Sequence, residues 1–305
     1  MAHEDKNHGF CSKILLFGEY SVIQNSMALS LPYSLFEGVL TFRRDQAIGV
    51  DSELKALSQY LKSLEKSGEL DFDFDVTSFE FDIGQGLYFD STIPQGFGVG
   101  SSGALCAALY HRYCVPQEDI DLLELKRRFV ILESHFHGSS SGMDPLISYK
   151  KRPILRHESG KLEEVELPKI GQGPGGIFLL NTGRARRTEP LVNLFLEKCN
   201  LDSFKNLCLD VLLPQTNDCI RHFLKGDWET LYTSFRSLSD FQYEHFNAMI
   251  PKLYRDIWLE GKESKQFSLK LCGAGGGGFL LGMTPDFKAA SDSLKAYEIR
   301  PFLRF

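Results

Sequence analysis

Pro94-Gln-Gly-Phe-Gly-Val-Gly-Ser-Ser-Gly-Ala-Leu-Cys-Ala-Ala-Leu109 is the segment that most strongly indicates the fold of this chain. Gly96, Gly98 and Gly100 allow the backbone to bend sharply and to approach a ligand without interference from a Cβ atom. The alanine-rich stretch after the two serines favours a helix. A glycine loop that leads into a helix directs free N–H groups and the positive end of the helix dipole toward one place. The segment therefore predicts an anion-binding loop, although a glycine-rich turn before a buried helix would read the same way.

Composition places the chain among ordinary folded proteins. It has 305 residues, of which 43% are hydrophobic and 24% charged, enough for one large domain or two modest ones. The net charge of −6 and the absence of a long basic run argue against a nucleic-acid surface. A short cluster, Arg184, Arg186 and Arg187, could meet a small anion or form a solvated turn.

The sequence also predicts a cytoplasmic location. No apolar segment of 18 residues is present, and the polar N-terminus lacks the apolar core of a signal peptide. Seven scattered cysteines without a C-x-x-C pair are typical of reduced, structural thiols. We therefore expect no membrane contact and no zinc site.

The first half of the chain predicts strands at 14–17, 28–35 and 38–42 and a helix over 51–66. Alternating apolar residues between 72 and 89 predict half-buried strands. We expect a helix from the glycine–serine loop to about residue 113, a break at Pro116, and a second helix capped by Asp119 or Asp121. Two short strands around a turn at 159–160 are predicted over 146–165.

The second half begins with a glycine- and proline-rich joint at 171–176. Strands are predicted at 177–180, 267–272 and 279–283, with several helices over 189–260 and a terminal helix over 287–297. The predicted fold class is α+β with two domains, residues 1–170 and 171–305.

Two common catalytic patterns match only in their letters. Segments 98–103 and 273–278 spell G-x-G-x-x-G, which needs a strand before it and a helix after it in a dinucleotide-binding fold. Residues 90–94 are a poor strand sequence, and residues 279–283 favour a strand rather than a helix. Gly138-Ser-Ser-Ser-Gly142 spells G-x-S-x-G, but a predicted helix precedes Ser140 where a hydrolase needs a strand. These patterns argue against an oxidoreductase and a serine hydrolase.

Two acidic residues suit phosphoryl transfer, which needs oxygen ligands for Mg²⁺ and a carboxylate beside the attacking hydroxyl. Glu133 can supply an oxygen to the metal, together with the hydroxyl of Ser101 or Ser102. Asp144, which we expect in a tight Ser-Gly-Met-Asp turn, can act as the base. Either acidic residue alone could equally be a surface charge.

Three segments in order resemble the motifs of the GHMP kinases, a family of small-molecule kinases: Lys13-Ile-Leu-Leu-Phe-Gly-Glu19, Pro94–Gly103 and Lys270-Leu-Cys-Gly-Ala-Gly-Gly-Gly-Gly278. Within the family the likeness is greatest to the mevalonate kinases, whose segment E-x-x-x-H-G-x-x-S-G-x-D is matched at every fixed position by residues 133–144. The resemblance implies a first domain like ribosomal protein S5 domain 2 and a ferredoxin-like second domain. In this family the third motif steadies the phosphate loop.

The resemblance also implies an activity: ATP- and Mg²⁺-dependent phosphorylation of the 5-hydroxyl of mevalonate for isoprenoid synthesis, by an enzyme that can form a homodimer. Asp144 would be the catalytic base, and Lys13 would pair with it, favour its ionised form and neutralise charge on the phosphoryl group. Glu133 and Ser102 would bind Mg²⁺, with Ser101 as the alternative to Ser102. The residues implied to hold the ATP phosphates are Gly96, Gly98, Gly100, Ser101, Ser102 and Gly103, and those implied near the substrate are Glu19, Tyr20 and Thr188.

Some positions depart from the pattern and leave alternatives open. Tyr20 stands where mevalonate kinases usually have histidine, and Gly-Glu-Tyr is common in phosphomevalonate kinases. Phe97 and Val99 make the loop unusual, and Gly103 stands where alanine is usual. A phosphomevalonate kinase would need more cationic side chains around its acceptor, for which the arginine cluster at 184–187 is the compact candidate. A kinase-fold ligand sensor without catalysis would require a lost base, metal ligand or lysine, and all three are present.

Overall fold

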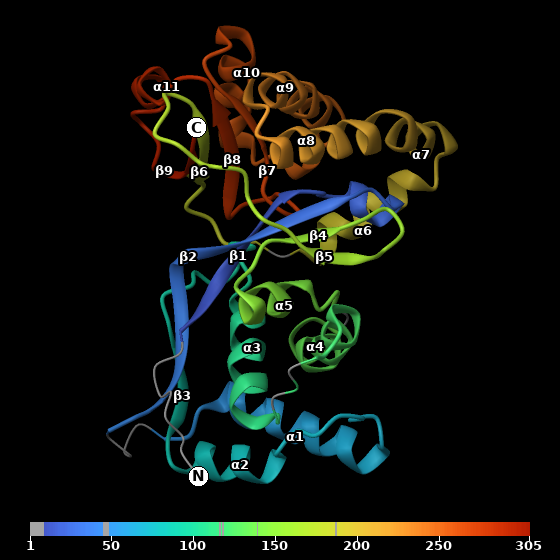
Figure 1. Ribbon diagram of the computed structural model, residues 1–305, viewed down its shortest axis with the longest axis vertical. Coiled ribbons are helices and arrows are strands. Elements are labelled where there is room, and N and C mark those ends of the chain that lie inside the picture. Colours follow the sequence, from blue (N-terminus) through green and yellow to red (C-terminus); the bar gives the residue numbers. More distant parts are fainter. Residues whose placement is uncertain (1–8, 45–48, 116, 118, 139, 187) are drawn as a thin grey trace. The chain divides into compact units, whose positions relative to one another are not determined.

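The computed structural model in Figure 1 describes residues 9–44, 49–115, 117, 119–138, 140–186 and 188–305. The chain forms two compact units that interleave along the sequence. The first unit comprises Met1–Lys13, Pro32–Pro94 and Val99–Arg152, and the second comprises Ile14–Leu31, Gln95–Gly98 and Pro153–Phe305. The predicted division into residues 1–170 and 171–305 stays a prediction. Pro116 and Arg187 lie outside the described residues.

Strands β1 (Phe10–Phe17) and β2 (Ala28–Phe42) each contribute residues to both units. The two strands predicted at 28–35 and 38–42 are thus one continuous strand. In the first unit, β3 (Leu87–Ser91) pairs antiparallel with the second half of β2, from Gly38 opposite Ser91 to Phe42 opposite Leu87. In the second unit, the start of β2 pairs with β4 (Ile154–Arg156), which pairs with β5 (Leu162–Glu164). The strand order is β1-β2-β4-β5, with β3 also on β2.

Helix α2 (Val76–Gly84) lies where alternating strands were predicted, and that prediction is wrong. The side chain of Asp75 caps the helix by accepting from the N–H of Ser78 at 2.8 Å. Val76, Phe79 and Ile83 form its buried face at helical spacing, whereas Phe81 is 67% exposed. Phe79, Phe81 and Ile83 alternate in sequence like the buried residues of a strand, but in the helix Phe81 faces away from the buried side.

The remaining helices of the first unit are α1 (Ser52–Ser67), α3 (Ser101–Tyr113), α4 (Leu122–His137) and α5 (Met143–Lys150). The first three confirm the sequence predictions, and Asp121 caps α4. Helix α5 corrects the prediction for the start of segment 146–165, and it places Asp144 in a helical first turn instead of a tight turn. Gly142, with φ of 67°, forms the left-handed residue that precedes α5.

The second unit contains a sheet of order β7-β8-β6-β9 in which every neighbouring pair is antiparallel. Its strands are β6 (Gly176–Asn181), β7 (Ser268–Leu271), β8 (Phe279–Thr284) and β9 (Ile299–Arg304). With α11 (Phe287–Ser293) between β8 and β9, this is the β-α-β-β-α-β order of a ferredoxin-like domain, as expected. Strand β9 was not predicted, and α11 ends earlier than the helix expected over 287–297.

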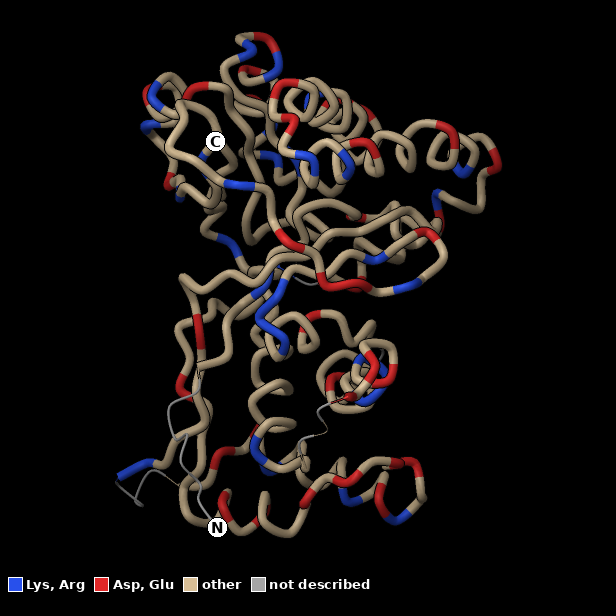
Figure 2. Tube along the Cα trace, viewed as in Figure 1, with Lys and Arg blue, Asp and Glu red and all other residues tan. Residues whose placement is uncertain are grey.

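A run of helices connects β6 to β7: α6 (Glu189–Cys199), α7 (Asp202–Leu207), the π-helical segment η3 (Cys208–Leu212), α8 (Leu213–Lys225), α9 (Trp228–His245) and α10 (Arg255–Ser264). None of the described helices is long and apolar enough to cross a membrane. Figure 2 shows acidic and basic residues interspersed along the described chain in both units.

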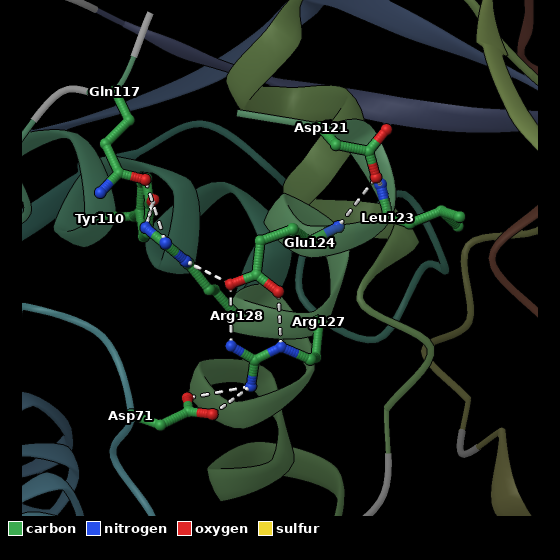
Figure 3. A network of polar contacts seen from close by, with 8 residues as sticks. All are labelled: Asp71, Tyr110, Gln117, Asp121, Leu123, Glu124, Arg127 and Arg128. Atoms are coloured by element: carbon green, nitrogen blue, oxygen red, sulfur yellow. Dashed lines mark hydrogen bonds and ion pairs between the residues drawn. The ribbon is translucent and has the colours of Figure 1, made fainter. Parts of the chain in front are cut away.

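In the first unit, Arg128 of α4 connects three neighbours (Figure 3). Its guanidinium donates to Glu124 at 2.9 Å, to the Tyr110 hydroxyl of α3 at 2.9 Å and to Gln117 at 3.0 Å. Its side chain is only 13% exposed, whereas that of Arg127, which pairs with Asp71 and Glu124, is 43% exposed. Arg128 therefore contributes packing as well as charge, and Arg127 contributes mainly exposed ion pairs.

We expect Arg128→Ala to lower the free energy of unfolding by ~1–2 kcal/mol, because it removes the part-buried hydrogen bond from α4 to the Tyr110 hydroxyl of α3, whereas Glu124 keeps its hydrogen bonds from Arg127. Arg127→Ala is the matched control and should cost less than ~1 kcal/mol, because exposed ion pairs are screened by water. Urea unfolding followed by circular dichroism measures both. Equal costs for the two variants would contradict this account.

Candidate active site

Lys13 and Asp144 form an ion pair in the first unit. Nζ of Lys13 lies 3.0 Å from Oδ1 of Asp144, and the two side chains are 11% and 31% exposed. Lys13 is fixed on β1 by its backbone N–H, which donates to the carbonyl of Val99 at 2.9 Å. Asp144 is fixed by the first turn of α5. The structure thus brings together the two residues predicted to catalyse, from segments 131 positions apart in the chain.

Two glycines of the predicted phosphate loop lie against this pair. Gly100 precedes α3 with φ of 82°, and a Cβ atom there would lie 3.0 Å from Cγ of Lys13 and 3.5 Å from Oδ2 of Asp144. At Gly103 a Cβ atom would lie 2.7 Å from Cβ of Asp144 and 2.8 Å from its carbonyl carbon. Gly103 is buried where α3 meets α5, which explains glycine at a position where alanine is usual. In the structure Gly103 lies against Asp144. The contact of Gly103 with the ATP phosphates stays a prediction.

Glu133 is a buried carboxylate that serine hydroxyls surround. It is 3% exposed; Ser140 donates to its Oε2, and Oγ of Ser102 lies 3.4 Å from its Oε1. Burial, and next the charge of Asp144, raise the pKa of Glu133 to about 7, against the opposing effects of Ser140, Lys13 and Ser102. The sequence predicts no role for Ser140 beside Glu133; as the middle serine of Gly138–Gly142 it matches only the nucleophile position of a hydrolase pattern.

The Ser102 and Glu133 oxygens fit a magnesium ion. Carboxylate and hydroxyl oxygens are the ligands that Mg²⁺ prefers, and a nearby cation would relieve the repulsion between Glu133 and Asp144. No group of three or more His, Cys, Asp or Glu side chains placed to hold a metal occurs in the described part of the chain. In nucleotide-dependent enzymes Mg²⁺ commonly takes one or two protein ligands and completes its shell with phosphates and water. Ser101 is the first residue of α3 and stays an alternative ligand.

The second unit contains a buried ion pair that the sequence does not predict. Lys270 of β7 and Glu19 are 0% and 1% exposed at their side chains, and Nζ of Lys270 donates to Glu19 and to the carbonyl of Leu271. Glu19 also accepts from the backbone N–H of Gly273, the first glycine of the third motif. Burial raises the pKa of Glu19, while Lys270 acts to lower it. A lysine inside an apolar strand was the available signal, because a buried ammonium requires a counter-charge.

Tyr20 is held within the second unit by the same third motif. Its hydroxyl donates to the carbonyl of Ala274 at 2.6 Å, and its ring lies 4.8 Å from that of Phe195 and 5.1 Å from that of Phe246. Burial raises the pKa of Tyr20 well above its usual value, so the phenol stays neutral. Glu19 and Tyr20 thus attach the first motif to the loop at 273–278. Their predicted contact with substrate stays a prediction.

Arg186 connects the remaining predicted residues of the second unit. Its backbone N–H donates to the carbonyl of Gly96 at 2.8 Å, and its guanidinium donates to Thr188. Its Nη2 would lie 2.3 Å from a Cβ atom at Gly98 and 2.8 Å from one at Gly273. Glycine at both positions therefore makes room for the guanidinium. The sequence indicates Arg186 only as part of a short basic cluster.

The third motif also supports the phosphate loop within this unit. A Cβ atom at Gly278 would lie 2.3 Å from the carbonyl oxygen of Phe97, and the Phe97 ring lies 5.6 Å from that of Phe279. Phe97, one of the unusual residues of the loop, is thus a packing contact. The predicted residues fall into two groups. The first unit holds Lys13, Gly100, Ser101, Ser102, Gly103, Glu133 and Asp144, and the second holds Glu19, Tyr20, Gly96, Gly98 and Thr188.

Glu133→Gln tests whether the buried carboxylate is costly to ionise. The pKa of Glu133 is about 7 in the folded protein and 4.5 ordinarily, so its contribution to stability is present below pH 4.5 and is lost as pH rises through 7. We expect E133Q to gain ~1–3 kcal/mol of unfolding free energy relative to wild type between pH 4.5 and pH 8. Urea unfolding of both proteins at the two pH values measures the difference. A difference that does not change with pH would show that Glu133 ionises normally.

Gly103→Ala tests the contact between α3 and Asp144. The added methyl group must displace α5, so we expect a loss of ~1–3 kcal/mol in unfolding free energy. Gly84, at the end of α2, has open space where a Cβ would lie, so Gly84→Ala is the matched control and should be neutral or slightly stabilising. Thermal unfolding compares the two variants. Equal stability of both would mean that α3 and α5 tolerate a wider separation.

Comparisons with known proteins concern the fold of the chain and the family of one of its segments. Residues 56–152 match the family model described as the GHMP kinases N terminal domain. Among curated proteins, none matches the sequence significantly. Similar solved structures include L. major mevalonate kinase in complex with R-mevalonate, with a TM-score of 0.63 and 18% identity over 94% of this chain and 90% of that chain.

Two further structures have other substrates in their names. Streptococcus pneumoniae phosphomevalonate kinase in complex with phosphomevalonate and AMPPNP has a TM-score of 0.64 and 14% identity over 97% of this chain and 99% of that one. Lactococcus lactis galactokinase complexed with galactose has a TM-score of 0.65 and 16% identity over 97% of this chain and 92% of that chain. At these identities the likeness shows a shared fold, and the match to the GHMP kinase N-terminal family model covers residues 56–152.

Proposed function

We propose that this chain, which contains a GHMP kinase N-terminal domain and has the fold of GHMP kinases, is an ATP- and Mg²⁺-dependent kinase that phosphorylates the 5-hydroxyl of mevalonate. The observation that carries the proposal is the Lys13–Asp144 ion pair beside Gly100, the residue that ends the glycine loop. This arrangement places a carboxylate and a cation beside the loop expected to hold phosphate. General base catalysis and charge neutralisation are what phosphoryl transfer to an alcohol requires.

Each residue of the first unit then has a defined task. The carboxylate of Asp144 takes the proton of the acceptor hydroxyl. The oxygen of that hydroxyl forms a bond to the γ-phosphorus of ATP, and the bond from this phosphorus to the β,γ-bridging oxygen breaks, so that ADP leaves. The ammonium of Lys13, beside Asp144, would stabilise the negative charge of the phosphoryl group during its transfer. Glu133 and Ser102 would hold Mg²⁺, which when bound neutralises phosphate charge. The backbone N–H groups at the start of α3 would bind phosphate oxygens.

The acceptor is proposed from residues 133–144, which match the catalytic segment of mevalonate kinases. Phosphomevalonate is the second candidate, and two observations favour it. Tyr20 replaces the usual histidine, and the guanidinium of Arg186 lies against Gly98 and Gly273, where a cation could meet a second phosphate. A ligand sensor without catalysis is disfavoured because Lys13, Glu133 and Asp144 are all present.

The deciding measurement is ADP release with mevalonate, phosphomevalonate, galactose and homoserine as acceptors. We expect the highest kcat/KM with mevalonate, whereas a higher value with phosphomevalonate would assign the second candidate. ADP release with none of the four would overturn the proposed activity.

Asp144→Asn tests the base with whichever acceptor is active. We expect kcat to fall ~10²–10⁴-fold, because the amide cannot accept the proton, while the affinity for AMPPNP changes less than about threefold. Asp71→Asn, at an exposed carboxylate paired with Arg127, is the control and should leave kcat unchanged. Near-native turnover of D144N would show that another group is the base.

A further inference from the structure

Ser102 lies between two possible acceptors for its hydroxyl proton. Its Oγ is 2.9 Å from Nε2 of His137 and 3.4 Å from Oε1 of Glu133. Hydrogen bonds from a hydroxyl normally have heavy-atom distances of about 2.5–3.0 Å, so the contact with His137 is the stronger one and the contact with Glu133 is long. His137 is the last residue of α4 and lies one helical turn after Glu133, so a single helix supplies both neighbours of Ser102.

The direction of this proton decides whether Ser102 can serve a cation. A serine hydroxyl has one proton and two lone pairs, so its oxygen faces a cation only when the proton points to another acceptor. Oε2 of Glu133 already accepts from Ser140, which leaves Oε1 as the oxygen that faces Ser102. If Oε1 also serves the cation, the proton of Ser102 needs an acceptor other than Glu133. The structure places Nε2 of His137 in that position.

We propose that His137 is a positioning residue of the divalent-cation site, whose Nε2 accepts the proton of Ser102 and so leaves the lone pairs of Oγ available to the cation. The proposal rests on the proposed kinase function, because that function supplies the cation. It assigns to His137 the neutral tautomer with its proton on Nδ1. Groups that orient metal ligands in this way typically change metal affinity by 10–100-fold when they are replaced.

The experiment measures Mn²⁺ binding by electron paramagnetic resonance in the presence of saturating AMPPNP, which is not turned over. We expect His137→Leu, which removes the acceptor, to raise the Kd for Mn²⁺ about tenfold. His137→Gln keeps an acceptor oxygen at similar reach, and its Kd should stay within about threefold of wild type. The affinity for AMPPNP without metal should be unchanged in both variants.

Two controls separate positioning from direct ligation. In a Ser102→Ala background, His137→Leu should raise the Kd by less than about twofold, because the hydroxyl that His137 orients is gone. His135→Leu replaces a histidine of the same helix whose ring lies 5.2 Å from that of Tyr60, and it should leave the Kd for Mn²⁺ unchanged. In the wild-type protein, long-range ¹H–¹⁵N NMR spectra should show the proton of His137 on Nδ1.

Several results would overturn the proposal: an unchanged Kd in H137L, a Kd in H137Q as weak as in H137L, or an equal effect of H137L with and without Ser102. A proton on Nε2 of His137 in the NMR spectra would overturn it as well. Failure of the kinase function is distinguished by the assay of ADP release. If the wild-type protein binds Mn²⁺ with AMPPNP but releases no ADP with any acceptor, the proposed function fails while the role of His137 stands.

Discussion

The approach of α3 to α5 at Gly103 is the contact on which the candidate site of the first unit depends. Because glycine has no Cβ, the backbone of α3 comes close enough for the carbonyl carbon of Asp144 to occupy space that any other side chain would fill. This contact sets the position of Asp144, and Asp144 in turn is the partner of Lys13. Phosphoryl transfer tolerates little error in such positions, since a small displacement of a reacting group is costly to the rate.

The second constraint on the structure is that its buried charged side chains need compensating partners. Glu133 is almost completely buried, and its raised pKa shows that serine hydroxyls alone do not compensate its charge. Lys270 and Glu19 neutralise each other in the second unit, and Glu19 also holds the N–H of Gly273. Burial raises the pKa of both carboxyl groups, but Glu19 has a lysine as its direct partner, whereas Glu133 has serine hydroxyls as partners and the charge of Asp144 nearby. A buried carboxylate without a direct cationic partner is typical of functional sites.

Much of the fold could be predicted because its signals are local. Helices α1 and α4 have capping aspartates and apolar spacing within their own segments, and α3 is an alanine-rich stretch that follows a glycine loop. Strands β6, β7 and β8 are short apolar runs that lie next to glycines, whereas β9 has no such signal. The errors at α2 and α5 arose where a local pattern had two meanings. Apolar residues at 79, 81 and 83 alternate as in a strand, but Asp75 caps a helix there and Phe81 faces outward. Near Asp144 the Ser-Gly-Met-Asp sequence predicts a turn, whereas Gly142 is the residue that precedes a helix.

The sequence by itself determined which chemical groups the protein can use: a glycine loop before a helix, two carboxylates, a lysine beside a buried strand and a serine pair. The sequence identifies these groups because each pattern lies within one short segment of the chain. Only the tertiary structure decided how they act. It placed Asp144 against Lys13, bound Glu19 to Lys270, brought His137 to Ser102 and set Arg186 against Gly98. These pairings join residues that are distant in the chain. The burial that shifts the pKa values of the acidic residues exists only once the helices and strands have packed together.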